Sequence, residues 1–266
     1  MKFKEWFKKR VSLVSSLSTQ LQDDYDAEML HQYRINLRKL HSFSEVYAKQ
    51  IDEKSSKEFS KLIKKILKPT ALLRDLDLFL IEIDAIECSQ QTKEQLYIDF
   101  NSKREQAFQS FMDRLQSSEY KQKLKKLRLI AEDSDFISYE VKSIDKYKII
   151  KNKEKDIYNE YKRVNSDTSF KELHKLRKEF KKFRYGVDIY RKCFNESSDD
   201  LSDIADLKEL QDRFGSIQDC YVRLEFIRSI EDKLSKEQGV KLKDLFELKL
   251  QSAKQELFLH RDKELR

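Results

Sequence analysis

The chain has little of what a turn-rich or β-sheet protein needs. Its 266 residues include three glycines and one proline, whereas tight turns and strand connections depend on both residue types. Lys, Glu, Leu, Asp and Ser dominate the sequence instead. The composition therefore predicts an all-α protein.

Long apolar runs and paired cysteines are also missing. No run of about 18 or more apolar residues could span a bilayer, and the N-terminal segment MKFKEWFKKRVSLVSSLS lacks the apolar block and cleavage site of a secretory signal. Cys88, Cys193 and Cys220 form no CxxC pair, and buried thiols in a reducing compartment explain them best. We expect a cytoplasmic protein with no membrane partner.

Charge is abundant but nearly balanced. Asp, Glu, Lys and Arg make up 39% of the residues, with 55 Lys and Arg against 48 Asp and Glu. The net charge of +7 is modest for this length. The distribution of the basic residues therefore matters more than their excess.

Apolar residues recur at spacings of three and four along most of the chain, which is typical of long amphipathic helices. One such stripe consists of Leu173, Leu176, Phe180, Phe183, Val187 and Tyr190. Turn-prone segments at residues 50–56, 68–69, 117–119, 132–145, 165–169, 195–203 and 236–239 predict roughly ten helices. Two capping boxes, Ser55 with Glu58 and Ser169 with Glu172, and Pro69 in a first turn mark three helix starts.

A basic segment occurs twice in the chain. When HKLRKEFKKFRY (174–185) is aligned with HQYRINLRKLHS (31–42), four positions correspond. They are His31, Arg34, Arg38 and His41 in the first copy and His174, Arg177, Lys181 and Arg184 in the second, 143 residues later. An aspartate follows each histidine after 44 or 45 residues, Asp75 and Asp219 respectively. We interpret residues 1–266 as one domain with internal repeats 1–140 and 141–266.

The spacing places the basic residues of each copy on one side of a helix. At 100° per residue, offsets of 0, 3, 7 and 10 fall within an arc of about 80°, so the apolar residues opposite can be buried while the basic row stays open. Lys39, Lys178 and Lys182 widen the positive field. Such a row repels itself unless an anion neutralises it. A solvated helical face would explain either copy alone, but the duplication favours an anion-binding site.

The aspartates after each row have a predicted supporting role. Asp75 and Asp219 could accept hydrogen bonds from arginines or histidines of the rows and fix their direction, although a local salt bridge is the alternative. Helical metal ligands recur at i and i+4 or i+3, whereas the residue three positions after His31 or His174 is an arginine. We therefore expect no metal and no cofactor.

Four segments together resemble the CHAD family, the conserved histidine α-helical domain. They are HQYRINLRKLHSF (31–43), LLRDLDLFL (72–80), HKLRKEFKKFRYGVDIY (174–190) and LQDRFGSIQD (210–219), and the resemblance covers almost the whole chain. It implies an all-α fold of two four-helix-bundle-like halves related by a pseudo-twofold axis, with a basic central groove. It also implies inorganic polyphosphate as the ligand.

The resemblance assigns ligand-binding positions in this sequence. They are His31, Arg34, Arg38, Lys39, Arg74, His174, Arg177, Lys181, Lys182, Arg184 and Tyr185, with Asp75 and Asp219 in support, and the basic rows add His41 and Lys178. The sequence departs from the family pattern at three positions. His41 and Lys181 stand where the family often has arginine, and Ala71 is the first-half counterpart of Gly215.

We predict that the protein is not an enzyme and binds inorganic polyphosphate through these residues, more strongly when the histidines are protonated. RNA is an alternative ligand of the same surface, although Tyr185 is the only aromatic residue expected close to a row. A polyphosphate-processing enzyme that uses His31 or His174 is another, although the sequence has no P-loop or carboxylate pair. The third alternative is a purely structural helical scaffold that binds no ligand. The sequence does not reveal whether the protein has protein partners.

Overall fold

The computed structural model describes residues 3–48, 53–133, 136–137, 143–194 and 201–264. Ten α-helices and three short 3₁₀ helices account for most of these residues, and no strand occurs among them. The all-α prediction is confirmed, as is the predicted number of helices.

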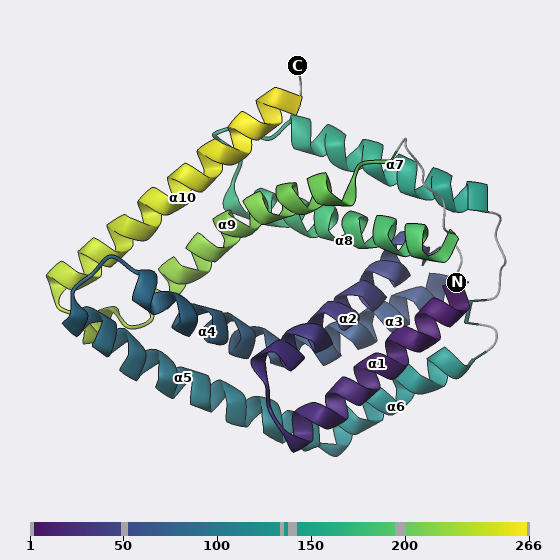
Figure 1. Ribbon diagram of the computed structural model, residues 1–266, viewed down its shortest axis with the longest axis horizontal. Helices are drawn as coiled ribbons and strands as arrows, with labels where there is room; N and C mark the ends of the chain where they lie inside the picture. The colour runs from purple at the N-terminus through teal and green to yellow at the C-terminus, as the bar shows by residue number, and fades with distance from the viewer. Residues whose placement is uncertain (1–2, 49–52, 134–135, 138–142, 195–200, 265–266) are drawn as a thin grey trace. The chain divides into compact units, whose positions relative to one another are not determined.

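The helices follow one another along the chain (Figure 1). The α-helices are α1 (Phe3–Asp23), α2 (Ala27–Val46), α3 (Glu53–Leu67), α4 (Ala71–Glu82), α5 (Gln90–Gln116), α6 (Ser118–Glu132), α7 (Ser143–Lys162), α8 (Phe170–Phe194), α9 (Ile204–Arg228) and α10 (Lys236–Glu264). The 3₁₀ helices are η2 (Lys68–Thr70), η3 (Ile83–Ala85) and η4 (Glu231–Lys233).

Two of the predicted helix starts are confirmed. The backbone N–H of Ser169 donates to Glu172 Oε2 (2.9 Å), and the N–H of Glu172 donates to Ser169 Oγ (3.3 Å), so a complete capping box begins α8. Pro69 lies in η2 directly before α4, where its missing N–H costs little.

Two other boundary predictions are wrong. Ser55 does not cap α3 but lies inside it, since the helix already includes Glu53. The sequence pattern was misleading because a Ser and a Glu three residues apart also lie on one face of a continuing helix. Gly239 lies inside α10. The helix begins earlier because Ser235 and Gln238 form a capping box, with N–H···O distances of 3.0 and 3.2 Å. This cap outweighs the low helix propensity of one glycine.

Residue contacts divide the chain into two compact units. Unit 1 contains Met1–Leu80, Asn101–Ile150 and Tyr185–Ser198, whereas unit 2 contains Ile81–Phe100, Lys151–Arg184 and Asp199–Arg266. Each unit therefore takes residues from both sides of position 140. The internal repeat and its pseudo-twofold relation stay predictions.

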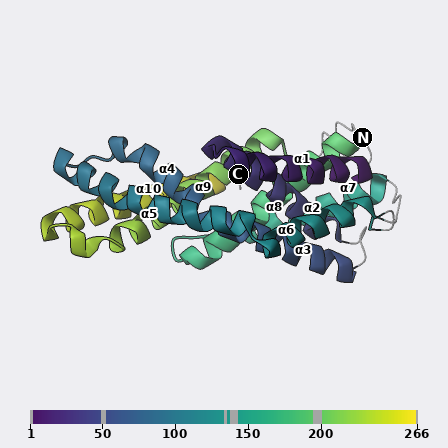
Figure 2. The same ribbon diagram turned by 90° about the horizontal axis from the view of Figure 1, so that it is seen from below.

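Unit 1 is built around four helices. α1 packs against α2 and α6, and α3 packs against the same two helices, so α1 and α3 lie on opposite sides of this bundle (Figure 2). Its core is aromatic: Trp6, Phe7, Phe43 and Phe59 are each at most 1% exposed. Burial of rings of this size supplies much of the hydrophobic stabilisation of the bundle.

Gly186 allows a close approach of α8 within unit 1. A Cβ atom at this position would lie 3.1 Å from Val46 Cγ1 and 3.1 Å from Ile150 Cδ1, which is tighter than ordinary van der Waals contact. The Tyr47 hydroxyl donates to the Gly186 carbonyl oxygen at 2.9 Å. The absence of a side chain at Gly186 therefore lets α2, α7 and α8 pack closely.

In unit 2, α9 and α10 pack along each other after the turn that contains η4. The ring of Phe180 on α8 packs against Tyr161 of α7 and Phe214 of α9, with centroid distances of 5.6 and 5.7 Å. The Tyr161 hydroxyl donates to the Leu257 carbonyl oxygen of α10 at 3.2 Å. Every residue of the predicted apolar stripe on α8 is at most 4% exposed, which confirms that prediction.

Candidate anion-binding site

The first basic row lies on α2 in unit 1. Asp26 caps this helix by accepting a hydrogen bond from the N–H of Met29 (2.6 Å). The apolar residues on the opposite side of the helix, including Tyr33, Leu37 and Leu40, are fully buried as predicted. The prediction that the whole basic row stays open is wrong, because the Arg34 residue is only 5% exposed.

Arg34 is covered because η2 lies against it. Its guanidinium Nη1 donates to the hydroxyl of Thr70, which is itself buried. Burial, followed by the nearby charges of Arg38 and Arg74, lowers the pKa of Arg34 to about 10. The negative charge of Asp75 opposes this change. Arg34 is thus still cationic at neutral pH, in a place where its charge is poorly solvated.

Arg74 on α4 joins this group. Its Nη1 donates to the Ala27 carbonyl oxygen at 3.3 Å, and its buried Nε has no acceptor in the described part of the chain. His31 is half-buried, and its pKa is lowered by burial first, then by Arg74, Arg38 and Arg34, while Glu28 opposes the change. We call His31, Arg34, Arg38 and Arg74 the α2 cluster. It concentrates positive charge where an anion would be stabilised.

The two predicted supporting carboxylates differ in position. Asp75 is close enough to Arg34 to raise the pKa of its guanidinium, as a supporting role requires. Asp219 is exposed on α9, and its charge contributes to the raised pKa of the neighbouring Cys220 thiol after the larger effect of burial. Their roles in orienting the basic rows stay predictions.

The second basic row lies on α8, and the residues before Tyr185 belong to unit 2. All of its predicted side chains in this unit are half-buried except Lys178, which is exposed. Arg184 Nε donates to Gln211 Oε1 on α9 at 2.9 Å. Glu179 accepts from Lys182 at 2.8 Å and from Lys153 on α7 at 2.7 Å. Several members of this row are therefore held by partners within unit 2.

His174 at the start of this row lies beside an aromatic stack. Its ring stacks on Phe170, with centroids 5.9 Å apart, and Phe170 stacks on Tyr221 at 3.7 Å. The prediction that Tyr185 is the only nearby aromatic residue is wrong, since Phe170 precedes His174 by one turn and Tyr221 comes from α9. Burial, Lys178 and Arg177 lower the pKa of His174, whereas the neighbouring Gln218 side chain raises it.

Three further predicted residues have partners inside unit 1. Lys39 Nζ lies 3.2 Å from Asp188 Oδ2 and 5.8 Å from the centroid of the Tyr185 ring, which is buried. His41 Nε2 lies 3.0 Å from Ser60 Oγ and 3.1 Å from Glu45 Oε1. A polyanion would have to compete with carboxylates for Lys39 and His41. The predicted ligand contacts of Lys39, His41 and Tyr185 stay predictions.

The sequence of the chain matches a known family. The sequence model of the CHAD domain matches residues 9–228. The chain belongs to the CHAD family. Membership of this family links the protein to a polyphosphate-related function.

Two solved structures share this CHAD fold. The CHAD domain from the plant Ricinus communis superposes with a TM-score of 0.74 at 14% sequence identity, covering 97% of this chain and 92% of that chain. PptA from Streptomyces chartreusis superposes with a TM-score of 0.76 at 10% identity, covering 98% of this chain and 97% of that chain. No curated protein matches the sequence. The all-α fold expected from the resemblance is confirmed.

Several residues around the rows of this CHAD domain were not predicted. They are Lys153, Phe170, Glu179, Asp188, Gln211 and Tyr221. A signal for Asp188 was available, because Asp188 follows His174 by 14 residues and Glu45 follows His31 by the same number. Lys153 and Gln211 had no such signal, since they approach the row from α7 and α9.

Neither a membrane span nor a metal cluster is found in the part of the CHAD chain that the structure describes. No helix there is long and apolar enough to cross a bilayer. Within the same residues, no group of three or more His, Cys, Asp or Glu side chains is arranged to hold a metal ion.

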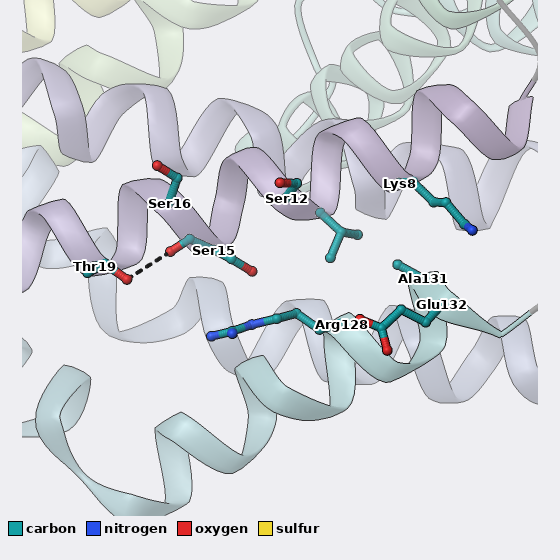
Figure 3. A pocket seen from close by; sticks show the side chains of 9 residues that line it. Lys8, Ser12, Ser15, Ser16, Thr19, Arg128, Ala131 and Glu132 are labelled. Carbon is teal, nitrogen blue, oxygen red and sulfur yellow. Dashed lines mark hydrogen bonds between the residues drawn. The ribbon is translucent and has the colours of Figure 1, made fainter.

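A separate cavity of about 480 Å³ lies between α1 and α6 in unit 1 (Figure 3). Its polar lining includes Ser12, Ser15, Ser16 and Thr19 of α1 and Arg128 and Glu132 of α6. Arg128 is exposed and forms no ion pair with any residue in the described ranges. The lining includes no predicted ligand-binding residue, so Arg128 offers a control position for charge changes in unit 1.

Proposed function

We propose that this CHAD domain binds inorganic polyphosphate and does not change it chemically. The α2 cluster carries the proposal: Arg34, Arg38 and Arg74 lie together, and none of them forms an ion pair within 4.0 Å in the described part of the chain. Guanidinium groups suit phosphate oxygens because they can donate two parallel hydrogen bonds. A phosphate chain would relieve the mutual repulsion of the three arginines.

The α8 row supplies a second proposed contact surface. Arg177, Lys178, Lys181 and Arg184 lie on the part of the α8 surface outside its buried apolar stripe. Contacts to successive phosphates from lysine and arginine are electrostatic and release bound counter-ions. We therefore expect the affinity to fall steeply as the salt concentration rises.

The surroundings of the two histidines support binding without catalysis. A catalytic histidine is usually oriented by a hydrogen bond to a carboxylate. Neither His31 nor His174 donates a hydrogen bond to a carboxylate within the described residues. Arginines and lysines dominate the charges near both rings, as an anion-binding surface requires.

The aromatic stack beside His174 does not favour RNA. Proteins that bind single-stranded nucleic acid use aromatic rings as open platforms for bases. The Phe170 ring already stacks on Tyr221 at 3.7 Å with an interplanar angle of 9°, and it also packs against His174. Internal stacking of these rings favours a ligand without bases.

Binding of long polyphosphate, triphosphate, ATP and RNA should be measured at about 50 and 200 mM salt. We expect long polyphosphate to bind most tightly and to lose most affinity at the higher salt. Arg38→Glu should weaken its binding at least tenfold, as loss of an Arg–phosphate contact does. The matched control Arg128→Glu makes the same charge change in unit 1 and should alter affinity less than about twofold.

Two outcomes would replace the proposal. Displacement of long polyphosphate by RNA at equal phosphate concentration would identify RNA as the preferred ligand. Release of orthophosphate from long polyphosphate, abolished by His31→Ala or His174→Ala, would identify an enzyme. Unchanged polyanion binding after Arg38→Glu would contradict the role of the α2 cluster.

A further inference from the structure

Asp188 on α8 is a carboxylate surrounded by cations from three helices of unit 1. Its oxygens lie 2.9 Å from Lys192 Nζ on the same helix and 3.2 Å from Lys39 Nζ on α2. Arg10 on α1 is close enough for Asp188 to raise the pKa of its guanidinium against the larger effect of burial. One carboxylate therefore interacts with three cationic side chains.

The Asp188 side chain is 15% exposed but stays ionised. Burial alone would raise the pKa of Asp188, yet its hydrogen bonds and charge interactions with Lys192 and Lys39 hold it below the ordinary value. The carboxylate in turn matters to Lys39, whose pKa is lowered by burial and is supported by Asp188. The cations and the carboxylate thus stabilise one another in the ligand-free protein.

Asp188 also faces the same way as the basic row of α8. At 100° per residue, a position 14 residues after His174 falls between the directions of Arg177 and Lys181 on the helix. Glu45 occupies the equivalent position after His31, and it lies 3.1 Å from His41 Nε2 and 3.3 Å from Lys64 Nζ. Each basic row is followed on its own face by a carboxylate with basic partners.

We propose that Asp188 is a built-in counter-ion of unit 1, which stabilises the basic surface without ligand and competes with a polyanion for Lys39 and Lys192. This inference rests on the proposed function, because it takes polyphosphate as the ligand. A phosphate group that approaches Lys39 meets the negative charge of Asp188 and gains less attraction than the lysine alone would give. Asp188 therefore limits the affinity of unit 1 for polyanions.

The substitution Asp188→Asn keeps the shape of the side chain and removes its charge. We expect opposite effects on stability and binding: a lower melting temperature at low salt, and an affinity for long polyphosphate about three to ten times higher at about 50 mM salt. The plot of log affinity against log salt should become steeper by about one, because one more cation becomes available to phosphate. Both differences should shrink at high salt.

Glu119→Gln is the matched control, since Glu119 pairs with Lys123 on α6 at 2.7 Å in the same unit. It removes the same charge away from the basic rows and should leave polyphosphate affinity within twofold of the wild type. Lower stability of Asp188→Asn with equal or weaker binding would overturn the proposal, because Asp188 would then only position Lys39. Failure of the wild type to bind polyphosphate would instead overturn the proposed function.

A measurement on the wild type covers the case in which Asp188→Asn does not fold. The carboxyl pKa of Asp188 can be followed by carbon NMR with and without long polyphosphate. Competition for Lys39 and Lys192 should raise this pKa when the ligand binds. An unchanged Asp188 signal in a saturated complex would show that the ligand does not share these lysines, and would overturn the proposal.

Discussion

The basic residues that α2 contributes to the α2 cluster have the same spacing in sequence as those of the α8 row, but the two groups have different surroundings. In the α2 cluster, Arg34 is buried against Thr70 and is accompanied by Arg38 and Arg74. On α8, Arg184 is held by Gln211, and Lys182 shares Glu179 with a lysine of α7. The first arrangement concentrates three arginines beside one nearby carboxylate, Asp75, whereas the second distributes charge among neutral and acidic partners.

This difference indicates that the two rows contribute unequally to binding. An anion gains most where cations are partly desolvated and lack ion-paired carboxylates, because the protein has not yet neutralised them. The α2 cluster meets this description. The α8 row resembles a prearranged surface, in which partners fix side-chain directions and reduce the gain from each contact.

The largest expected effect is on binding. The double variant Arg38→Glu with Arg74→Glu should lower polyphosphate affinity about a hundredfold, because it reverses two charges of the α2 cluster. The double variant Arg177→Glu with Lys181→Glu in the α8 row should lower it about tenfold. Titration of both proteins with long polyphosphate at one salt concentration measures the ratio.

Circular dichroism and a melting curve should show that both double variants keep the fold, which separates lost contacts from unfolding. Equal losses in the two variants would remove the distinction between the α2 cluster and the α8 row. A larger loss for Arg177→Glu with Lys181→Glu would reverse it and make the α8 row the main contact surface.

The second expected effect is on stability. Arg34 and Arg177 are corresponding positions of the predicted repeat, but burial and neighbouring cations lower the pKa of Arg34 to about 10. Arg34→Met keeps an unbranched apolar stem and removes the buried charge, so the free energy of unfolding should rise by about 1–2 kcal/mol without ligand. Arg177→Met should change it by less than about 0.5 kcal/mol. Urea unfolding at low salt measures both values.

The sign of this change is informative because Arg34→Met should also weaken polyphosphate binding. If the Arg34→Met variant is more stable but binds polyphosphate more weakly, the α2 cluster lowers the stability of the ligand-free protein while providing an anion site. Lower stability of Arg34→Met would mean that the hydrogen bond to Thr70 outweighs the cost of the buried charge. Arg34 would then be a structural residue.

The helix faces could be predicted from the sequence, but the surroundings of the rows could not. Periodicity indicates the direction of each side chain relative to its own helix, and the burial of Leu37 and Phe180 follows from it. Periodicity does not reveal which side chains from other helices lie against that face. Thr70 meets Arg34 across 36 positions of the chain, and Asp188 meets Lys39 across 149.

The wrong boundary at Gly239 has a local reason. One glycine was a weak local signal, whereas the capping box of Ser235 and Gln238 was a stronger one nearby. The capping box at Ser169 was predicted because its residues are adjacent to a clear apolar stripe. Such a motif is not sufficient by itself, since Ser55 and Glu58 fit the same pattern but lie inside α3.

The smallest expected effect is on pH dependence. Burial and neighbouring cations lower the pKa of both His31 and His174, so each is stabilised as the neutral form in the folded protein. The stability that these lowered pKa values contribute is present above the ordinary pKa of about 6.5 and is lost as pH falls through the folded values. A bound polyanion should raise both pKa values and take up protons. Polyphosphate affinity should therefore be about threefold higher at pH 6 than at pH 8.

His31 should account for more of this dependence than His174, because three arginines lower the pKa of His31 against the opposing charge of Glu28, whereas two cations, Lys178 and Arg177, lower that of His174. His31→Gln should therefore flatten the pH profile more than His174→Gln. His260→Gln is the control, since His260 lies 3.2 Å from the Tyr161 hydroxyl and outside both rows. Equal affinity at pH 6 and pH 8 in the wild type would show that neither histidine titrates with the ligand, and the distinction between the rows would then rest on arginine and lysine alone.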